Sequence, residues 1–221
     1  MSAFMLKLIA IITMTIDHTG AIIFKDIGIL RMIGRLAFPI FAFLIANGYF
    51  YTKNLKKYIL RLFVFALIAQ YPFMLAFDIG NEMYLNIFFT LFLGLISIAM
   101  YDHVANKILG LFAVAALAYS ATLLNTDYGY YGVLLIFCFF AFKDDFIKMS
   151  LSIISLNLAF STINVFMYEY FSPVMYTQCL SCFSLIFIYC YNNRKGKSMK
   201  YLFYVFYPAH LLIIYGISKL I

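Results

Sequence analysis

Five stretches of this 221-residue chain contain no Asp, Glu, Lys or Arg, and they constrain its fold more than any other feature. An α-helix needs about 20 predominantly apolar residues to cross the hydrocarbon core of a bilayer, and each stretch is close to that length. We therefore predict that each is a transmembrane helix. The five stretches are Met83–Tyr101, Ile108–Thr126, Met149–Tyr168, Tyr170–Asn193 and Tyr201–Ser218.

Four further apolar stretches are shorter or are interrupted by polar residues, which brings the expected total to about nine spans. All these runs are continuously apolar, without the alternation that strands of a membrane barrel require. The mean hydropathy of +0.96 is also higher than a soluble domain needs. We predict an all-α polytopic membrane protein that forms a single transmembrane domain over residues 1–221. The four additional stretches are Phe4–Phe24, Ile29–Tyr51, Tyr58–Phe77 and Gly129–Phe142.

The net charge of +7 is distributed unevenly between the loops. Loops of one parity are basic, and loops of the other parity contain most of the acidic residues. The positive-inside rule then predicts a cytoplasmic amino terminus in a plasma (inner) membrane, and it explains the basic charge without nucleic-acid binding. The basic set is Lys53, Lys56, Lys57, Arg61, Lys107, Lys143, Lys148, Arg194, Lys195, Lys197 and Lys200. The opposite set is Lys25, Asp26, Arg31, Asp78, Glu82, Asp127 and Glu169.

The four cysteines all lie in apolar stretches, and Cys179 and Cys182 form a C-x-x-C pair. Such a pair on a soluble loop indicates redox or metal chemistry. No second pair and no nearby histidine completes a metal site here. We therefore interpret the cysteines as small packing residues and expect no metal.

Several polar residues from distant parts of the chain are predicted to share one depth, toward the outer surface. Each has a structural alternative, since an amide often bonds a neighbouring helix and an acid–base pair can simply connect two helices. Ionisable groups inside a bilayer are costly, however, and usually mark a pathway or a catalytic site. The combination therefore favours a functional cavity. The residues are Asp17, His18, Arg35, Gln70, Asn86, Asp127 and His210.

Lys7 and His18 lie eleven residues apart in the first predicted span. This spacing is close to a whole number of helical turns, so both residues face the same way, separated by ~16 Å along the axis. A face with a cation at one end and an imidazole at the other suits an elongated phosphate-bearing donor such as acyl-coenzyme A. Lys7 alone could instead extend to the interface. Arg61, within the start of its helix, is a further candidate for the donor phosphates, because guanidinium can contact a phosphate at two points.

Several segments resemble the TraX family of membrane proteins, in order and over nearly the whole chain. They are KLIAIITMTIDHTGAI, RMIGRLAFPIFAFLIANGYFYTKN, YILRLFVFALIAQYPF, LNIFFTLFLGL, DYGYYGVL and FYPAHLLIIYGI. The name-giving member of that family is associated with amino-terminal acetylation of conjugative pilin. More distantly, the chain resembles the membrane acyltransferases that O-acetylate surface sugars, through Lys7, His18, Gly34, Arg35, Pro39 and Phe41. Lys7 stands where that group usually has arginine.

The resemblance implies an acetyltransferase that uses acetyl-coenzyme A as donor and an extracytoplasmic amine or hydroxyl as acceptor. An imidazole with an ordinary pKa of about 6.5 is a suitable general base, so His18 is the candidate base. Asp17 is expected to pair with Arg35 or to fix a neighbouring helix, and His210 is either a second base or an orienting partner. Arg35, Gln70 and Asn86 are candidate donors to the oxyanion. Candidate substrate-binding residues are Lys7, Arg61, Gln70, Asn86 and Asp127.

Two other classes of protein remain open. A solute or proton-coupled transporter would also gather His, Asp and Arg at one depth, although it usually has internal repeats or broken helix pairs, and neither is evident here. A scaffold subunit would need no polar cavity. The sequence does not distinguish a peptide amine from a surface glycan as the acceptor.

Overall fold

The computed structural model describes residues 1–80, 82–167, 173–197 and 200–220. Glu169, one of the outer-loop acids, lies outside the described residues, as does Asn81. Within the described ranges the chain is helical, and its only β-type pairing is an isolated bridge between Leu85 and Thr126. The prediction of an all-α protein is therefore confirmed.

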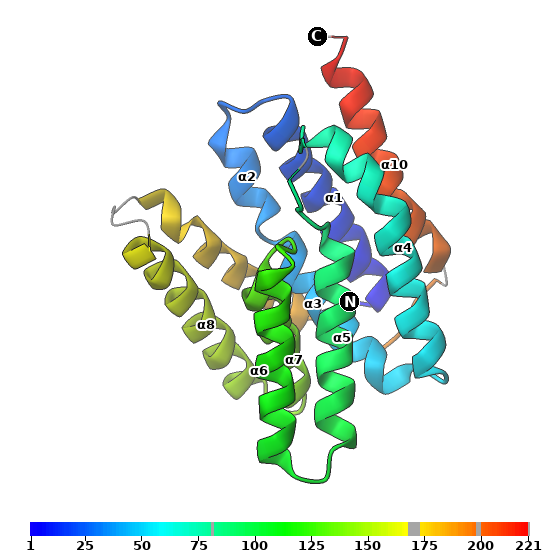
Figure 1. The fold of residues 1–221 in the computed structure, drawn as a ribbon, viewed down its shortest axis with the longest axis vertical. Helices are drawn as coiled ribbons and strands as arrows, with labels where there is room; N and C mark the ends of the chain where they lie inside the picture. The colour runs from blue at the N-terminus through cyan, green and yellow to red at the C-terminus, as the bar shows by residue number, and fades with distance from the viewer. Residues whose placement is uncertain (81, 168–172, 198–199, 221) are drawn as a thin grey trace.

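The helices follow one another with short connections, as the apolar stretches predict (Figure 1). They are α1 (Ala3–Ile22), α2 (Gly28–Gly34), α3 (Ala37–Tyr51), α4 (Leu55–Ala76), α5 (Ile87–His103), α6 (Lys107–Leu123), α7 (Gly129–Ala141), α8 (Phe146–Met167), η1 (Pro173–Phe183), α9 (Ser184–Tyr189) and α10 (Lys200–Ser218).

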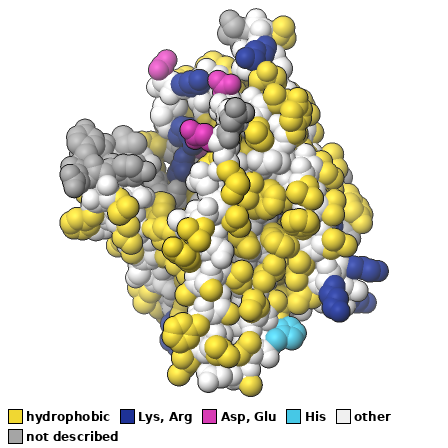
Figure 2. All heavy atoms as spheres, viewed as in Figure 1, with side chains coloured by type: hydrophobic (Ala, Val, Ile, Leu, Met, Phe, Trp, Pro, Cys, Tyr) yellow, Lys and Arg dark blue, Asp and Glu magenta, His cyan; other side chains and the backbone are white. Residues whose placement is uncertain are grey.

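Five helical segments are long and apolar enough to cross a membrane. Four others are apolar but shorter, so the count of nine spans stays a prediction. The five are Ala3–Ile22, Gly28–Tyr51, Leu55–Ala76, Phe146–Met167 and Tyr201–Ser218. The four shorter helices are Ile87–His103, Lys107–Leu123, Gly129–Ala141 and Tyr176–Tyr189. The face shown in Figure 2 is mostly hydrophobic, with charged side chains toward its two ends, as expected for a surface that contacts lipid.

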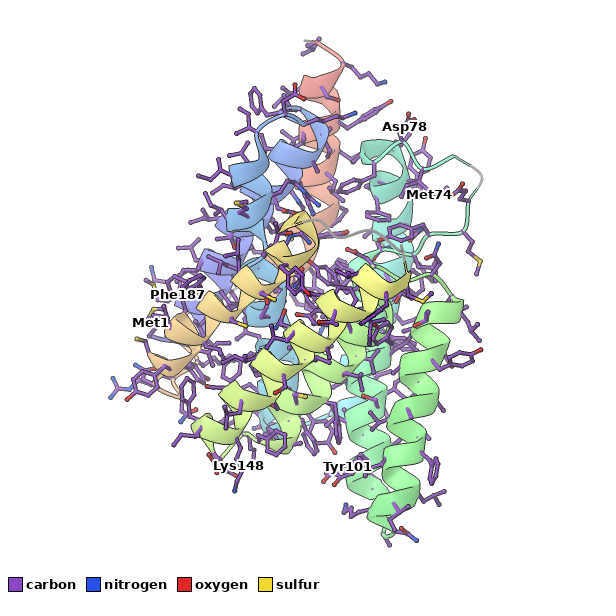
Figure 3. The ribbon with its side chains drawn as sticks, turned by 90° about the vertical axis from the view of Figure 1, so that its left-hand side faces the viewer. Met1, Met74, Asp78, Tyr101, Lys148 and Phe187 are labelled. Atoms are coloured by element: carbon purple, nitrogen blue, oxygen red, sulfur yellow. The ribbon has the colours of Figure 1, made fainter. Side chains whose placement is uncertain are left out.

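Two groups of helices enclose the region that carries the polar residues. Helix α10 packs against α4 and α1, whereas α5, α6 and α7 pack together and extend toward the lower end of the molecule (Figure 1). Helix α8 packs on η1 and α7. The view in Figure 3 places Asp78 near the upper end and Tyr101 and Lys148 toward the lower end.

The amino terminus is fixed to the segment that precedes α10. The Ala3 N–H donates to the Arg194 carbonyl at 2.8 Å, and the Asn192 N–H donates to the Met1 carbonyl at 2.9 Å. The first of these bonds satisfies a backbone N–H at the start of α1 that a helix leaves unpaired. Two segments that the loop charges assign to the same side are therefore adjacent.

The predicted second span, Ile29–Tyr51, is not one regular α-helix. Helix α2 ends at Gly34, and the Arg35 and Leu36 N–H groups donate to carbonyls three residues earlier, at 3.2 Å each. Pro39 lies in the first turn of α3, where a residue without an N–H is tolerated. The backbone therefore tightens where α2 meets α3, and this is the position of Arg35.

The predicted span Tyr170–Asn193 also differs from a regular α-helix. Its described part consists of an 11-residue 3₁₀-helix, η1, followed by the short helix α9. Because a 3₁₀-helix has 3.0 residues per turn, side chains three apart fall in one row. Gln178 and Ser181 occupy such a row within η1, and Ser184, the first residue of α9, follows three residues later; all three are buried. The winding of η1 thus places Gln178 and Ser181 on the same side of the segment.

Candidate active site

A cavity of about 710 Å³ extends through the helical bundle along α1. Both Lys7 and His18 line it, so it spans the ~16 Å that separates these two positions along a helix. Its walls are mainly aliphatic and aromatic. The polar lining residues fall into a basic group, Lys7, Arg61 and Lys195, and a mixed group, Asp17, His18, Arg31, Arg35, Asp127 and Gln178.

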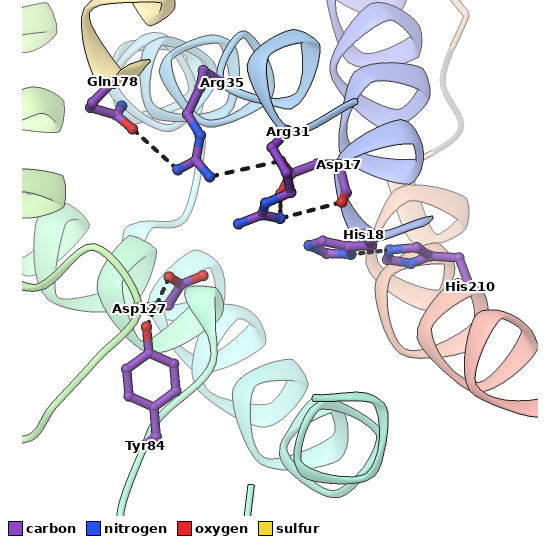
Figure 4. Close-up of polar contacts among 8 residues, drawn as sticks. All are labelled: Asp17, His18, Arg31, Arg35, Tyr84, Asp127, Gln178 and His210. Carbon is purple, nitrogen blue, oxygen red and sulfur yellow. Dashed lines mark hydrogen bonds and ion pairs between the residues drawn. The ribbon is translucent and has the colours of Figure 1, made fainter. Parts of the chain in front are cut away.

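His18 and His210 form a hydrogen-bonded pair in the mixed group (Figure 4). His18 Nδ1 lies 2.7 Å from His210 Nε2. The ring of Phe77 contacts His18 edge-on, with centroids 5.3 Å apart. His210 comes from α10, is buried, and contacts His18 from behind the cavity wall. The structure therefore brings together two predicted residues that are 192 positions apart.

Asp17 forms the predicted ion pair with Arg35, but its closer partner is Arg31, on the neighbouring helix α2. The Arg31 Nη1–Asp17 Oδ2 distance is 2.6 Å, whereas Arg35 Nη2 lies 3.9 Å from Asp17 Oδ1. The loop-charge pattern groups Arg31 with the outer loops, but in the structure Arg31 belongs to α2, which packs on α1. A Cβ atom added to Gly34 would overlap the Asp17 side chain, so the glycine permits this close approach.

Arg35 is held from its other side by a chain of buried polar groups. Its Nη1 donates to Gln178 Oε1 at 3.3 Å, and Gln178 Nε2 donates to the Tyr131 hydroxyl at 3.1 Å. That hydroxyl donates in turn to Asn157 Oδ1 at 3.0 Å. Tyr131 and Asn157 are 0% exposed, so these buried hydrogen bonds fix which side of the Gln178 amide faces Arg35. In the sequence, only its polarity within an apolar stretch distinguishes Gln178.

Gln70 and Asn86 bind each other and the backbone, and neither lines the cavity. Gln70 Nε2 donates to the Tyr84 carbonyl at 2.7 Å. Asn86 Nδ2 lies 2.8 Å from both Gln70 Oε1 and the Ala66 carbonyl, and Asn86 Oδ1 caps α5 at the Phe88 N–H. These predicted oxyanion donors therefore connect α4 to the start of α5.

Asp127 lines the cavity from the turn between α6 and α7. The Tyr84 hydroxyl donates to its Oδ1 at 3.3 Å, and the Thr90 hydroxyl donates to its backbone carbonyl. Tyr128, the next residue, has a positive φ of 67°, which turns the chain into α7. Burial raises the pKa of Asp127 to about 6, against the opposing effect of Arg35. This carboxyl group therefore holds its proton more tightly than an exposed aspartate does.

The basic group occupies the other end of α1. Lys7 Nζ lies 5.2 Å from the centre of the Phe203 ring. Arg61 Cζ lies 5.3 Å from the centre of the Tyr58 ring and 5.4 Å from the centre of the Tyr204 ring. The Arg61 Nε atom is buried and has no hydrogen-bond partner. None of the ion pairs among the described residues includes Lys7, Arg61 or Lys195, the three cations of the basic group.

Lys195 joins this group through backbone contacts that the sequence did not reveal. The Phe4 N–H donates to the Lys195 carbonyl at 3.2 Å. Gly196 follows with a φ of 70°, a conformation that favours glycine. Lys7, Arg61 and Lys195 thus line one end of the cavity, and none of them has a carboxylate partner among the residues that the structure describes. In the described ranges no group of three His, Cys, Asp or Glu side chains is placed to hold a metal.

Known proteins place this chain in a family. No solved structure matches it. A protein of Rickettsia prowazekii (strain Madrid E), described as uncharacterized, is 39% identical over 66 residues, which cover 30% of this chain and 25% of that protein. The probable fimbrial assembly protein FimC, serogroup H1, of Dichelobacter nodosus is 30% identical over 233 aligned positions, covering 96% of this chain and 94% of FimC. The family described as TraX protein matches residues 2–218. The chain therefore belongs to the TraX family.

Proposed function

We propose that this chain is an integral membrane acyltransferase that moves an acetyl group from acetyl-coenzyme A to an amine or hydroxyl. One observation carries the proposal: a single cavity connects a basic end without carboxylates to a paired histidine. An elongated donor with phosphates at one end and a thioester at the other matches this arrangement. Neither a carrier nor a scaffold requires such polarity along one cavity.

The basic end is the proposed site of the coenzyme A phosphates. Lys7, Arg61 and Lys195 supply positive charge, and the unpartnered Nε of Arg61 is a buried donor. Charge-assisted hydrogen bonds to phosphate are stronger than bonds between neutral groups. The neighbouring rings of Tyr58, Phe203 and Tyr204 offer flat surfaces for the adenine base.

The mixed end is the proposed site of chemistry. The acceptor nitrogen or oxygen attacks the thioester carbonyl carbon, and His18 Nε2 takes the proton that the acceptor loses. The carbonyl oxygen becomes an oxyanion, which the guanidinium groups of Arg31 and Arg35 stabilise. When the tetrahedral intermediate collapses, the carbon–sulfur bond breaks, and the proton on His18 passes to the departing coenzyme A thiolate.

The acceptor is proposed to lie outside the cytoplasm, as a peptide amine or a surface glycan. The similarity to a probable fimbrial assembly protein favours a fimbrial or pilin-like subunit. Coenzyme A is cytoplasmic, so the basic end should face inward in a plasma membrane with a cytoplasmic amino terminus. The loop charges support this orientation.

The test compares two histidine variants in purified protein reconstituted into lipid nanodiscs. Radiolabelled acetyl-coenzyme A is supplied with a periplasmic and cell-surface extract, and transfer of the label is measured. We expect His18→Ala to lower transfer at least ~100-fold, the usual contribution of a general base. The matched control is His103→Ala, because His103 is exposed and does not line the cavity.

Retention of activity in His18→Ala would refute His18 as the base. Transport of a solute without covalent change, in protein that transfers no acetyl group, would refute the enzyme proposal. Mass spectrometry of surface proteins and glycans from cells with and without the gene then identifies the acceptor by its loss of an acetyl group.

A further inference from the structure

The imidazoles of His18 and His210 meet edge to edge. Their planes are 11° apart, and their centroids lie 5.0 Å apart, with 2.7 Å between His18 Nδ1 and His210 Nε2. This centroid separation is the one that results when both nitrogens lie on the line joining the ring centres. The nitrogen lone pair lies in the plane of its ring, so the contact has the geometry of a direct N–H···N hydrogen bond.

The direction of this bond follows from the opposite side of His210. His210 Nδ1 lies 2.9 Å from the backbone carbonyl oxygen of Phe206. A carbonyl can only accept, so Nδ1 must carry the hydrogen. In a neutral ring Nε2 is then the acceptor, and His18 Nδ1 must be the donor. His18 is left with an unprotonated Nε2.

We infer that His210 is a positioning residue that holds His18 in the tautomer with a free Nε2. Figure 4 shows the His18 ring between His210 and the side on which Arg31 and Asp127 lie, and His18, Arg31 and Asp127 all line the cavity. His210 is 4% exposed and does not line the cavity, so it does not contact an acceptor there. The catalytic consequence rests on the proposed function, but the tautomer itself does not.

His210, rather than a carboxylate, accepts the hydrogen bond from His18 Nδ1. Asp17 is adjacent to His18 in sequence, but its carboxylate is bonded to Arg31. The hydrogen bond from His18 Nδ1 becomes charge-assisted when Nε2 gains a proton, so His210 also stabilises the imidazolium. A neutral imidazole can do this beside two arginines without adding charge of its own.

The test replaces His210 with glutamine and with alanine. Glutamine can place its Oε1 where the His210 Nε2 lies, so it can still accept from His18 Nδ1, but it cannot act as a base. We expect His210→Gln to keep acetyl transfer within ~10-fold of the wild type. His210→Ala should lose a further 10- to 100-fold, the usual effect of removing such a supporting group, in kcat rather than in KM for acetyl-coenzyme A.

A second measurement reads the tautomer directly. The chain has only three histidines, so single variants assign every signal in ¹⁵N NMR spectra of histidine-labelled protein in nanodiscs. We expect His18 to carry its hydrogen on Nδ1 in the wild type and in His210→Gln, and to lose this preference in His210→Ala. The spectra do not require catalysis. If they show the expected tautomer in a protein without acetyl transfer, they would refute the proposed function and still support His210 as a positioning residue.

Two results would overturn the inference. Either a hydrogen on His18 Nε2 in the wild type or equal inactivity of folded His210→Gln and His210→Ala would do so. The second result would mean that His210 itself exchanges protons.

Discussion

Gly34 offers a sharp test of how Asp17 is positioned. It ends α2 at the point where this helix touches α1, and a Cβ atom there would overlap both the Cβ and the carboxylate of Asp17. The Cβ of Asp17 is attached to the backbone of α1, so a new rotamer cannot remove the overlap. Gly34→Ala must therefore push α1 and α2 apart or distort one of them.

The expected cost follows from the contacts that are lost. Overpacking typically costs about 1–3 kcal/mol, and disruption of a buried ion pair costs about 3–5 kcal/mol. The Arg31 side chain is 37% exposed, so the low end of the second range applies. Alanine returns about 1 kcal/mol through its preference for helix. A net loss of about 3–5 kcal/mol lowers the unfolding temperature of a chain of this size by roughly 6–20 °C.

The assay measures thermal unfolding in detergent by the loss of the monodisperse chromatographic peak. The control is Gly216→Ala, a helical glycine in α10 that has open space where a Cβ would stand. The same shift of α1 displaces His18, so Gly34→Ala should also lose at least ~10-fold in acetyl transfer, since small misplacements are costly. An unfolding temperature within 2 °C of the control, roughly 1 kcal/mol or less, together with full activity, would show that α1 and α2 do not need this contact.

Three further predictions concern the two ends of the cavity and its orientation. Arg61→Gln should raise the KM for acetyl-coenzyme A about 10-fold or more with little change in kcat. Lys53→Gln is the control, because Lys53 lies outside the cavity, and it should change neither constant much. Equal KM values in the two variants would exclude the basic end as the donor site. Because burial raises the pKa of Asp127 to about 6, against about 3.9 in an unfolded chain, the folded protein holds this proton more tightly. Thermal stability should therefore fall as the pH rises from about 4 to about 6. A fall of the same size in Asp127→Asn, which cannot ionise at this position, would show that Asp127 is not the group responsible. A reporter fused after Lys197 should be cytoplasmic and one inserted beside Asp127 external, and the reverse result would invert the membrane orientation.

The sequence was sufficient for the helical class because long apolar runs have few solutions in a bilayer. It also placed Lys7 and His18 on one face of one helix, which depends only on helical periodicity. Both residues line the cavity. Contacts between residues on different helices could not be predicted in this way, because they depend on packing that no local sequence pattern encodes.

Arg31 and Gln178 show what the sequence could not provide. Arg31 is only two residues from the expected start of the second span, so by position it resembles a charge at the edge of a loop, and only the packing of α2 on α1 brings it to Asp17. Gln178 lies in η1, a 3₁₀-helix where the apolar stretch predicts an α-helix, and its contact with Arg35 depends on how that segment packs. Gln70 and Asn86 show the converse, since polar residues at a suitable depth can serve only to join two helices.

The charges along the cavity give it a direction. Asp17 and Asp127 lie at the end that contains His18, where they offset Arg31 and Arg35, while Lys7, Arg61 and Lys195 have no acidic counterpart among the residues described. Because the acids offset the arginines at the His18 end, an anion gains most at the basic end. Under the proposed function, a donor with phosphates at one terminus settles in one orientation, with its thioester toward His18. The same charge asymmetry would then align the reactive carbon of that donor with the base.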